Sequence, residues 1–416
     1  MPRMGKFPPF GKRFFRLARQ LVGSCHFEHL WRIVTALASL QEGRSLSKFV
    51  DASDDRRSRQ AISNFLTLAD WNAPELLQKT ALDQLQRLGF RPGDPLYMLI
   101  DDTQKRKRGK LMAAVSKIFL HAEKVYANGH TILGAALVYR GVVLPCAVKL
   151  WASRESCRKS RTESDPIDRL QFRTLTGMAG DVVTALQLPE GVKPIVLFDS
   201  YYLCPVVTQA CEQRGWKYVG VAKKNRNFSP DGRPRDRRKL GTYGRTVLRR
   251  DGRTMSVRGK KHRLAERVGH LKRLGHVKLV FSRRPRDAAW VCLVTNETRW
   301  SMSTILSHYM RRWGIEVFFK MSKQYLGLGD YHLLRYRGIE RYLCLVLIAH
   351  LLLTHLALNA PDAKAKLKAR ADLRLPSVPH LQQDLRRELW NHVLDGLAKN
   401  KTTRHAANKF RKAILL

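Results

Sequence analysis

The chain has 416 residues, which is too long for one ordinary hydrophobic core, so two or three domains are expected. Hydrophobic residues make up 44% of it, which is enough to bury real cores and argues against general disorder. The formal net charge is +43, from 77 Lys and Arg against 34 Asp and Glu, and the basic residues are spread along the whole chain. Such an excess repels itself unless a polyanion neutralises it. An extended nucleic-acid surface is therefore the favoured partner, and an anionic membrane is the rival.

The cysteines and the apolar runs argue against several other classes of protein. Seven cysteines are scattered without a CxxC pair, which disfavours a disulfide scaffold or a cysteine-rich zinc site and fits a reducing cytoplasm. The basic N-terminus lacks the apolar segment of a signal peptide. The apolar run 342–358 contains two histidines and is shorter than the roughly 20 residues of a spanning helix. We therefore predict a buried core helix there.

Residues 1–92 are predicted to be helical and to bind DNA. Apolar residues recur at helical spacing in this region. Two aspartates precede an arginine-rich helical turn, and this pattern resembles a helix-turn-helix reader whose recognition helix starts near Arg56. On this interpretation Arg56, Arg57 and Arg59 contact DNA. A plain helical bundle with a charged surface is the alternative.

Residues 93–222 have the pattern of an α/β sheet. Three apolar, strand-like segments come first, and two of them are joined by a short turn at 140–141. A helix is predicted after Pro166, followed by an apolar strand that ends in Asp199, another helix and another strand. This order predicts a sheet with an antiparallel start and parallel additions.

The composition changes in residues 223–286, which we predict to be a basic β-rich insertion. Residues 223–263 contain sixteen Lys or Arg and three Asp or Glu. Short strands are expected here, for example at 245–250. Residues 287–345 are predicted to return to the α/β core and include a strongly helical segment. Residues 346–416 are predicted to be a helical C-terminal region.

Carboxylates at the ends of apolar strands suggest a metal site. Asp101 and Asp102 follow the strand-like run 97–100, and Asp199 ends a later strand. The carboxyl ends of strands are where open α/β sheets carry their sites. Glu316 would complete a cluster of three carboxylates with Asp102 and Asp199, and such a cluster repels itself unless a cation joins it. Oxygen ligands without histidine or cysteine point to Mg²⁺ or Mn²⁺, and two such ions support phosphodiester cleavage.

Glu316 belongs to a set of polar residues on one helix face. The set is spaced by three, four and seven residues, which keeps it within an arc of roughly 60°. Its members are Tyr309, Arg312, Glu316 and Lys323. A surface salt-bridge ladder is the alternative interpretation. It explains why Glu316 is near Arg312, but it does not explain the carboxylates on two strand ends.

These motifs together resemble a DDE transposase of bacterial insertion sequences, in the group marked by the YREK signature. The signature is Tyr, two residues, Arg, three residues, Glu, six residues and Lys, and the four residues of the helix face satisfy it. The run "IDDT" at 100–103 resembles the first aspartate motif of that group, and "LFDSYY" at 197–202 resembles the second. The resemblance extends from about residue 25 to 360 and includes the long β-rich insertion and the helical N-terminal region.

The resemblance implies an α/β fold: an RNase H-like mixed sheet interrupted by a basic β-rich insertion, with helical N-terminal and C-terminal regions. It implies three catalytic metal ligands, Asp102, Asp199 and Glu316. The family's ligand is the aspartate directly before threonine, so Asp102 is chosen and Asp101 is held in reserve. The rest of the signature is implied to contact the DNA backbone: Tyr309, Arg312 and Lys323. Relatives stack a flipped base on a tryptophan of the insertion, and Trp290 corresponds best, with core packing as the alternative.

The expected function is that of a cut-and-paste transposase that uses Mg²⁺, with Mn²⁺ as a substitute. It would bind the ends of an insertion sequence, cleave them, in one variant through hairpin ends, and join them to target DNA. The expected partners are double-stranded DNA, as terminal inverted repeats and as target, and a second copy in a homodimer on paired ends. No membrane partner is expected, and the location would be cytoplasmic and nucleoid-associated. The alternatives are a metal-dependent nuclease or resolvase without strand transfer, and a non-catalytic DNA-binding protein.

Overall fold

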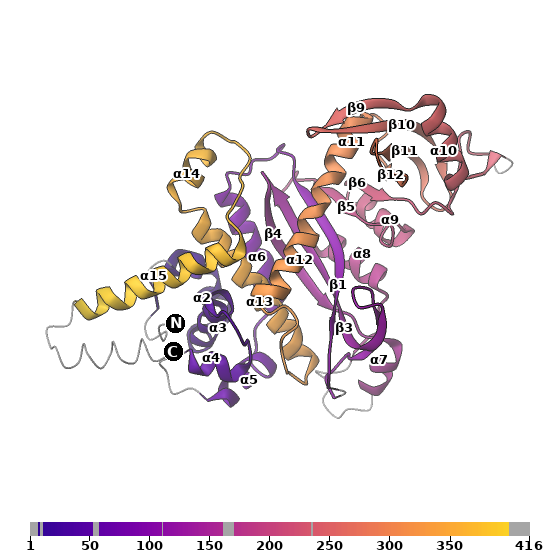
Figure 1. Ribbon diagram of the computed structural model, residues 1–416. Helices are drawn as coiled ribbons and strands as arrows, with labels where there is room; N and C mark the ends of the chain where they lie inside the picture. Colours follow the sequence, from indigo (N-terminus) through magenta and orange to yellow (C-terminus); the bar gives the residue numbers. More distant parts are fainter. Residues whose placement is uncertain are drawn as a thin grey trace.

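The computed structural model describes residues 7–8, 11–52, 58–109, 111–160, 170–233 and 236–398, which form a mixed α/β structure (Figure 1). The helices are α1 (Gly11–Phe14), α2 (Arg16–Val22), α3 (Ser24–Ser39), α4 (Leu46–Asp51), α5 (Arg59–Thr67), α6 (Ala73–Arg87), α7 (Arg154–Ser160), α8 (Leu175–Ala185), α9 (Pro205–Gln213), α10 (Leu240–Asp251), α11 (Met302–Tyr309), the 3-10 turn η3 (Met310–Arg312), α12 (Trp313–Tyr325), α13 (Tyr336–Ala357), α14 (Pro361–Lys368) and α15 (Val378–Ala398). The strands are β1 (Tyr97–Arg106), β2 (Ser116–Leu120), β3 (Val125–Tyr139), β4 (Val142–Leu150), β5 (Ile195–Phe198), β6 (Lys217–Val221), β7 (Asn227–Ser229), β8 (Arg238–Lys239), β9 (Arg253–Val257), β10 (Lys260–Leu271), β11 (Gly275–Arg283) and β12 (Trp290–Thr295).

The described strands form one mixed sheet, and its first part is the predicted α/β core. β1 pairs antiparallel with β3, and β3 pairs antiparallel with β4. On its other side β1 pairs parallel with β5, which in turn pairs parallel with β6. The antiparallel start and the parallel additions are therefore confirmed, and the arrangement is consistent with an RNase H-like core. β5 ends at Phe198, opposite Ile100, whereas β1 continues beside β3 to Arg106, so Asp101 and Asp102 lie in the middle of β1 and not at its end.

Residues 223–286 continue the same sheet and also contain a helix that was not expected. β12 pairs with β6, and β11 and β10 follow outward from it. The segment 245–250, predicted to be a strand, lies in α10, so that prediction was wrong. The buried residues of α10 recur at helical spacing: Leu240, Gly244, Val247 and Leu248. This periodicity lets the helix cover β10 and β11, and it outweighs the strand preference of the β-branched residues.

The helix predicted after Pro166 begins later than expected. Pro166 itself lies outside the described residues, but residues 170–174 are described and are not helical. α8 begins at Leu175, where the side chain of Thr174 accepts a hydrogen bond of 2.9 Å from the backbone N–H of Gly177. This N-cap decides where the helix starts, because it satisfies a donor that the first helical turn leaves free.

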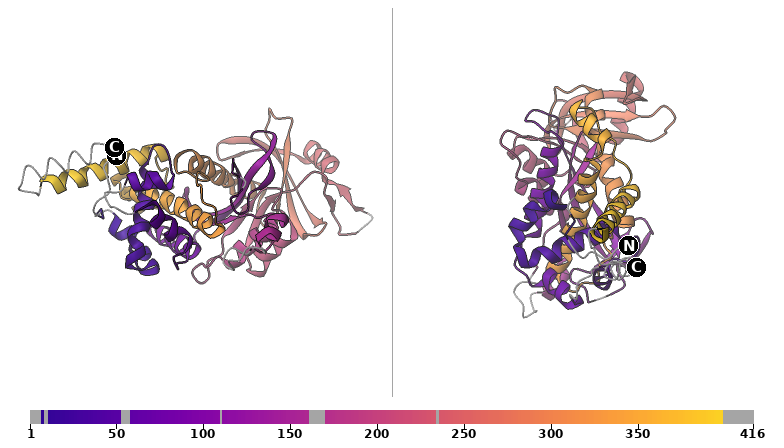
Figure 2. Two further views of the ribbon diagram at one scale, coloured as in Figure 1. Left: turned by 90° about the horizontal axis from the view of Figure 1, so that it is seen from below. Right: turned by 90° about the vertical axis from the view of Figure 1, so that its left-hand side faces the viewer.

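α13 is the central helix of a layer built from both ends of the chain. It packs against α3, α5 and α6 and against α15, as the views in Figures 1 and 2 also show. Among the described helices, α13 is the one long and apolar enough to cross a membrane, but most of it is buried inside the protein. The predicted core helix at 342–358 is therefore confirmed. Arg341, also buried, donates hydrogen bonds to the carbonyls of Leu66 at 3.1 Å and Trp71 at 2.8 Å, which ties α13 to α5 and to the segment after it.

α12 crosses one face of the sheet, close to β1 and β3 (Figure 1). Two glycines permit the close approach. A Cβ atom on Gly134 of β3 would lie 2.8 Å from the ring of Phe319 on α12, and one on Gly314 of α12 would lie 3.2 Å from Val143. The helical segment predicted here is confirmed, with η3 between α11 and α12. This packing holds Glu316 above β1.

Candidate active site

Asp101 and Asp102 project from β1 toward opposite faces of the sheet. Leu99 packs beneath α12, and side chains alternate along a strand, so Asp101 also faces α12. There Asp101 Oδ2 accepts a hydrogen bond of 2.9 Å from Arg312 Nη1. Asp102 faces the other way, and its Oδ1 accepts a hydrogen bond of 2.7 Å from the hydroxyl of Tyr202. The two neighbouring carboxylates therefore have different partners.

Asp199 lies beside Asp101 at the end of the parallel pair β1 and β5. Ile100 and Phe198 are the last paired residues of these strands, and the two aspartates follow them directly. Asp199 Oδ1 accepts a hydrogen bond of 2.8 Å from the backbone N–H of Tyr201, which fixes the carboxylate in the turn after β5. The register of the two strands therefore places Asp199 next to Asp101, but only Asp199 follows a strand end, because β1 continues to Arg106.

Arg312 joins carboxylates that come from two different elements. Its Nη1 donates to Asp101, and its Nη2 donates to Glu316, one helical turn further along. The side chains of Arg312 and Asp101 are only 15% and 17% exposed, so water weakens this ion pair less than a surface pair. The guanidinium carbon of Arg312 also lies 5.8 Å from the ring centroid of Tyr309. Three of the four signature residues therefore share one face, and that face meets β1.

Burial and nearby negative charge raise the pKa of both aspartates of β1. Burial raises the pKa of Asp101 to about 6, against the opposing effect of the Arg312 guanidinium and with a contribution from Asp199. Burial also raises the pKa of Asp102, the hydrogen bond from Tyr202 opposes that shift, and Asp199 adds to it. Asp199 is thus close enough to repel both carboxylates. A bound cation would relieve such repulsion.

A pocket of about 470 Å³ opens over β1 and α12. Its described lining residues are Asp101, Asp102, Thr103, Glu316, Phe319, Lys320, Lys323 and Gln324. Both aspartates of β1 therefore line the same pocket as Glu316 and Lys323, although the Asp102 carboxylate is turned to Tyr202, whereas Asp199 is not among the described lining residues. In the part of the chain that the structure describes, no three His, Cys, Asp or Glu side chains are grouped to hold a metal ion. Carboxylate oxygens suit Mg²⁺ or Mn²⁺. In this structure the guanidinium of Arg312 binds two of the carboxylates that would hold such an ion, Asp101 and Glu316.

Positive charge surrounds this pocket, and part of it was not predicted. Burial, together with the charge of Lys105, lowers the pKa of Lys323. Lys320 is exposed one helical turn after Glu316, so its helical spacing was a usable signal that sequence reasoning missed. Tyr202 was missed as well, because no spacing rule connects a residue of the turn after β5 to Asp102 on β1.

Trp290, the predicted partner of a flipped base, is packed inside the β-rich segment. Its side chain is 6% exposed and meets the ring of Phe281 edge-on, with centroids 5.8 Å apart. A Cβ atom on Gly244 would lie 2.6 Å from the indole, and the ammonium of Lys224 lies 4.6 Å from the ring centroid. These contacts agree with the core-packing alternative.

Two of the predicted N-terminal DNA contacts, Arg56 and Arg57, lie outside the described residues. Arg59 is described, is exposed, and is the first residue of α5. It lies on a second pocket, apart from the one that contains Glu316. The structure therefore does not gather Arg59 with the carboxylates.

Comparison with known proteins supports a nuclease family for this site. The model of a family described as DDE superfamily endonuclease matches residues 25–275, which is more than half of the chain. The matched range contains both aspartates of β1 and Asp199, and it ends before Glu316. A search among curated proteins found no match. The extent of the family match, together with the mixed sheet and its carboxylates, leads to one conclusion: the chain belongs to the DDE superfamily endonuclease family.

Proposed function

We propose that the chain is a transposase that binds the ends of a bacterial insertion sequence, cleaves the DNA there and joins the ends to target DNA. The observation that carries the proposal is the pairing of Arg312 with both Asp101 and Glu316, next to Asp199 at the end of the strand that pairs with β1. Membership of an endonuclease family supports cleavage of DNA. The net charge of +43 supports a polyanionic substrate.

The residues proposed to hold Mg²⁺, or Mn²⁺ in its place, are one aspartate of β1 together with Asp199 and Glu316. When bound, two such ions activate the attacking oxygen and stabilise the leaving oxygen of a phosphodiester. Asp102 is the first ligand by resemblance, because it directly precedes threonine. The geometry favours Asp101 as the ligand, because Asp101 and Glu316 both bind Arg312.

Arg312, Tyr309 and Lys323 are proposed to contact the DNA backbone. Arg312 neutralises Asp101 and Glu316 in the structure. Once these carboxylates have another partner, the guanidinium is available to a phosphate, which it can bind through two parallel hydrogen bonds. Lys323 lines the same pocket as Glu316 and would contact the same DNA strand as Arg312.

The proposed division of labour follows the order of the chain. Residues 1–92 would bind the element ends, with Arg56, Arg57 and Arg59 among the contacts. Residues 93–222 and 287–345 would form the catalytic core around the insertion at 223–286, and residues 346–416 would form a helical C-terminal region. Two copies would act together on paired ends in the cytoplasm, at the nucleoid. Stacking of a flipped base on Trp290 stays a prediction, and the burial of Trp290 weighs against it.

A nuclease that cuts without joining strands is the alternative, and the family description as endonuclease favours it. The two functions differ in one product, the covalent joint between an element end and a target. A single assay can therefore separate them.

The test begins with the DNA on either side of the gene, which should carry terminal inverted repeats if the chain is a transposase. A duplex with these ends is incubated with the full chain, Mg²⁺ and a target plasmid, beside the Glu316→Gln variant. We expect end cleavage and transfer to the plasmid by the parent chain, and neither by the variant. Cleavage without transfer would favour the nuclease, and the absence of both reactions in Mg²⁺ and Mn²⁺ would overturn the proposal.

A further inference from the structure

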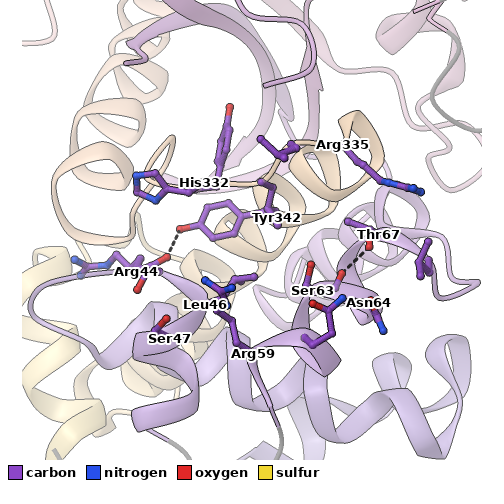
Figure 3. Close-up of a pocket in the computed structure, with 16 residues that line it drawn as sticks. Arg44, Leu46, Ser47, Arg59, Ser63, Asn64, Thr67, His332, Arg335 and Tyr342 are labelled. Atoms are coloured by element: carbon purple, nitrogen blue, oxygen red, sulfur yellow. Dashed lines mark hydrogen bonds between the residues drawn. The ribbon is translucent and has the colours of Figure 1, made fainter. Parts of the chain in front are cut away.

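A second pocket, larger than the one at Glu316, lies between α5 and the segment that leads from α12 to α13 (Figure 3). Its volume is about 610 Å³. We call it the α5 groove and define it by two walls: Arg59, Gln60, Ser63 and Asn64 on α5, and His332 and Arg335 opposite. None of its described lining residues is Asp or Glu. The described lining residues therefore contribute positive charge and hydrogen-bonding groups, which suit a phosphodiester backbone.

α5 divides into an apolar and a polar face. Its apolar residues Ile62, Phe65 and Leu66 are buried, and Phe65 stacks on Trp71 with centroids 5.0 Å apart. The residues that α5 turns to the groove are all polar: Arg59, Gln60, Ser63, Asn64 and Thr67. The apolar face anchors the helix, so the polar face is held in place and available to a partner.

Gln60 and Asn64 are arranged as a pair on this face. Gln60 Nε2 donates a hydrogen bond of 2.8 Å to Asn64 Oδ1, and both side chains are exposed. The second oxygen-nitrogen set of the pair, Gln60 Oε1 and Asn64 Nδ2, has no hydrogen bond to another described residue. Amide side chains of glutamine and asparagine are the ones that pair with the edge of adenine in the major groove.

We propose that the α5 groove holds one strand of double-stranded DNA, with its phosphates beside Arg59 and the opposite wall and its base edges read by Gln60 and Asn64. The inference rests on the proposed function and deepens it, because it names the surface that would distinguish an element end from other DNA. A helix in a major groove has a backbone on either side, and the wall at His332 would cover one of them.

The floor of the α5 groove is attached to the helix that carries Glu316. Arg44 lines the groove, is 6% exposed, and donates a hydrogen bond to the carbonyl of Tyr325, the last residue of α12. The preceding residue, Gln324, lines the pocket at Glu316. The α5 groove and the pocket at Glu316 are therefore attached to the same end of α12, so DNA bound in the groove lies against the helix that carries Glu316.

The test is selection of binding sites from random duplex DNA by the full chain in buffer without divalent cations. The parent chain should enrich a motif, and Gln60→Ala and Asn64→Ala should each lose preference at adjacent positions of it, by roughly tenfold or more. Gln86→Ala, an exposed glutamine on α6, is the matched control and should keep the parent motif. The same motif in all four proteins, or no motif for the parent chain, would overturn the inference.

Arg59→Ala tests the phosphate contact separately. It should weaken binding to all duplexes alike and reduce the salt dependence by about one phosphate, whereas the exposed Arg374→Ala should do neither. If Arg59→Ala and Arg374→Ala changed DNA affinity and its salt dependence equally, the phosphate contact proposed for Arg59 would be contradicted. Thermal melts identify any variant that fails to fold. Because these measurements need no cleavage, a chain that reads DNA but does not cut it would retain the inference and lose the proposed function.

Discussion

Asp101 and Asp102 are adjacent in the sequence, yet one is paired with Arg312 and the other with Tyr202. Their difference comes from the alternation of side chains along β1, since only one face of the sheet lies beneath α12. A metal ligand has to face the other ligands. Which of the two aspartates is the first metal ligand therefore depends on which face of the sheet the site occupies.

Neutral variants of the carboxylates should separate cleavage from binding. Asp199→Asn and Glu316→Gln keep the shape of each side chain but remove a charge that the proposed ions require. We expect both to lose cleavage and strand transfer by several orders of magnitude and to bind DNA as well as the parent chain. Cleavage on element-end DNA and binding by anisotropy are measured side by side. Parental cleavage by either variant would remove that residue from the site.

The family resemblance and the geometry make opposite predictions for the two aspartates of β1. The resemblance predicts that Asp102→Asn is inactive and Asp101→Asn active. The geometry predicts the reverse, because Asp101 lies with Glu316 around Arg312. We expect the geometric result, with loss of cleavage by several orders of magnitude in Asp101→Asn. An inactive Asp102→Asn beside an active Asp101→Asn would restore the first assignment.

Binding of a divalent cation should strengthen as pH rises through about 6. The raised pKa of Asp101 means that the folded chain keeps a proton between pH 4 and 6 that an unfolded chain has released. A protonated carboxyl is a poor ligand, so the proton competes with the cation below pH 6. We expect Mn²⁺ to raise the melting temperature more at pH 7.5 than at pH 5. Asp101→Asn should flatten this dependence, and an equal shift at both pH values in the parent chain would contradict it.

At the scale of elements, α12 is attached to the sheet by two kinds of contact. Gly134 and Gly314 allow close apolar packing, and Arg312 adds an ion pair to β1. The ion pair is mostly shielded, so removal of one partner leaves the other without compensation. Arg312 therefore holds two elements together in addition to its proposed contact with DNA.

Arg312→Ala should lower both stability and end binding. Asp101 would be left without its guanidinium partner, which costs about 1–3 kcal/mol. Its pKa would rise further, so the loss should be larger at pH 8 than at pH 5, where the carboxyl takes up a proton. Denaturant unfolding at the two pH values is the measurement. Lys320→Ala, exposed on the same helix, should leave stability unchanged, and equal stability of both variants would show that the ion pair adds nothing.

Trp290→Ala should act mainly on folding. The indole fills space between α10 and β11, so its loss leaves a cavity that costs about 3–5 kcal/mol. Denaturant unfolding measures this loss. Trp290→Phe keeps most of the packing and is the control. Normal stability of Trp290→Ala with failure to open hairpin ends would instead support a stacked base.

At the scale of the whole molecule, the charge is shared among regions that pack into one body. The helices of both chain ends meet around α13, and the insertion continues the core sheet through β12 (Figures 1 and 2). Basic residues on several of these elements can therefore act on one DNA molecule. Without DNA, a net charge of +43 on one body has to be neutralised by counterions.

DNA affinity should accordingly fall steeply with salt. Each phosphate that the chain neutralises releases counterions, so the logarithm of the affinity should fall linearly with the logarithm of salt concentration, by about 0.9 per contact. With several contacts at each proposed site, a tenfold rise in salt should cost several orders of magnitude in affinity. A titration series from low to high salt measures the slope. A slope near zero would contradict a DNA partner altogether.

The sequence by itself determined most of the elements of the core and the residue types that they carry, but not the helix α10. Apolar runs that end in Asp101, Asp102 and Asp199 predicted strands with acidic ends, and the spacing around Glu316 predicted a helix with one polar face. Only the tertiary structure decided which face of β1 meets that helix, where Arg312 binds, and that Trp290 is buried. The physical reason is that local periodicity depends on neighbours in the chain, which the sequence contains. Burial and ion pairing depend on segments hundreds of residues apart, and their meeting is settled by packing.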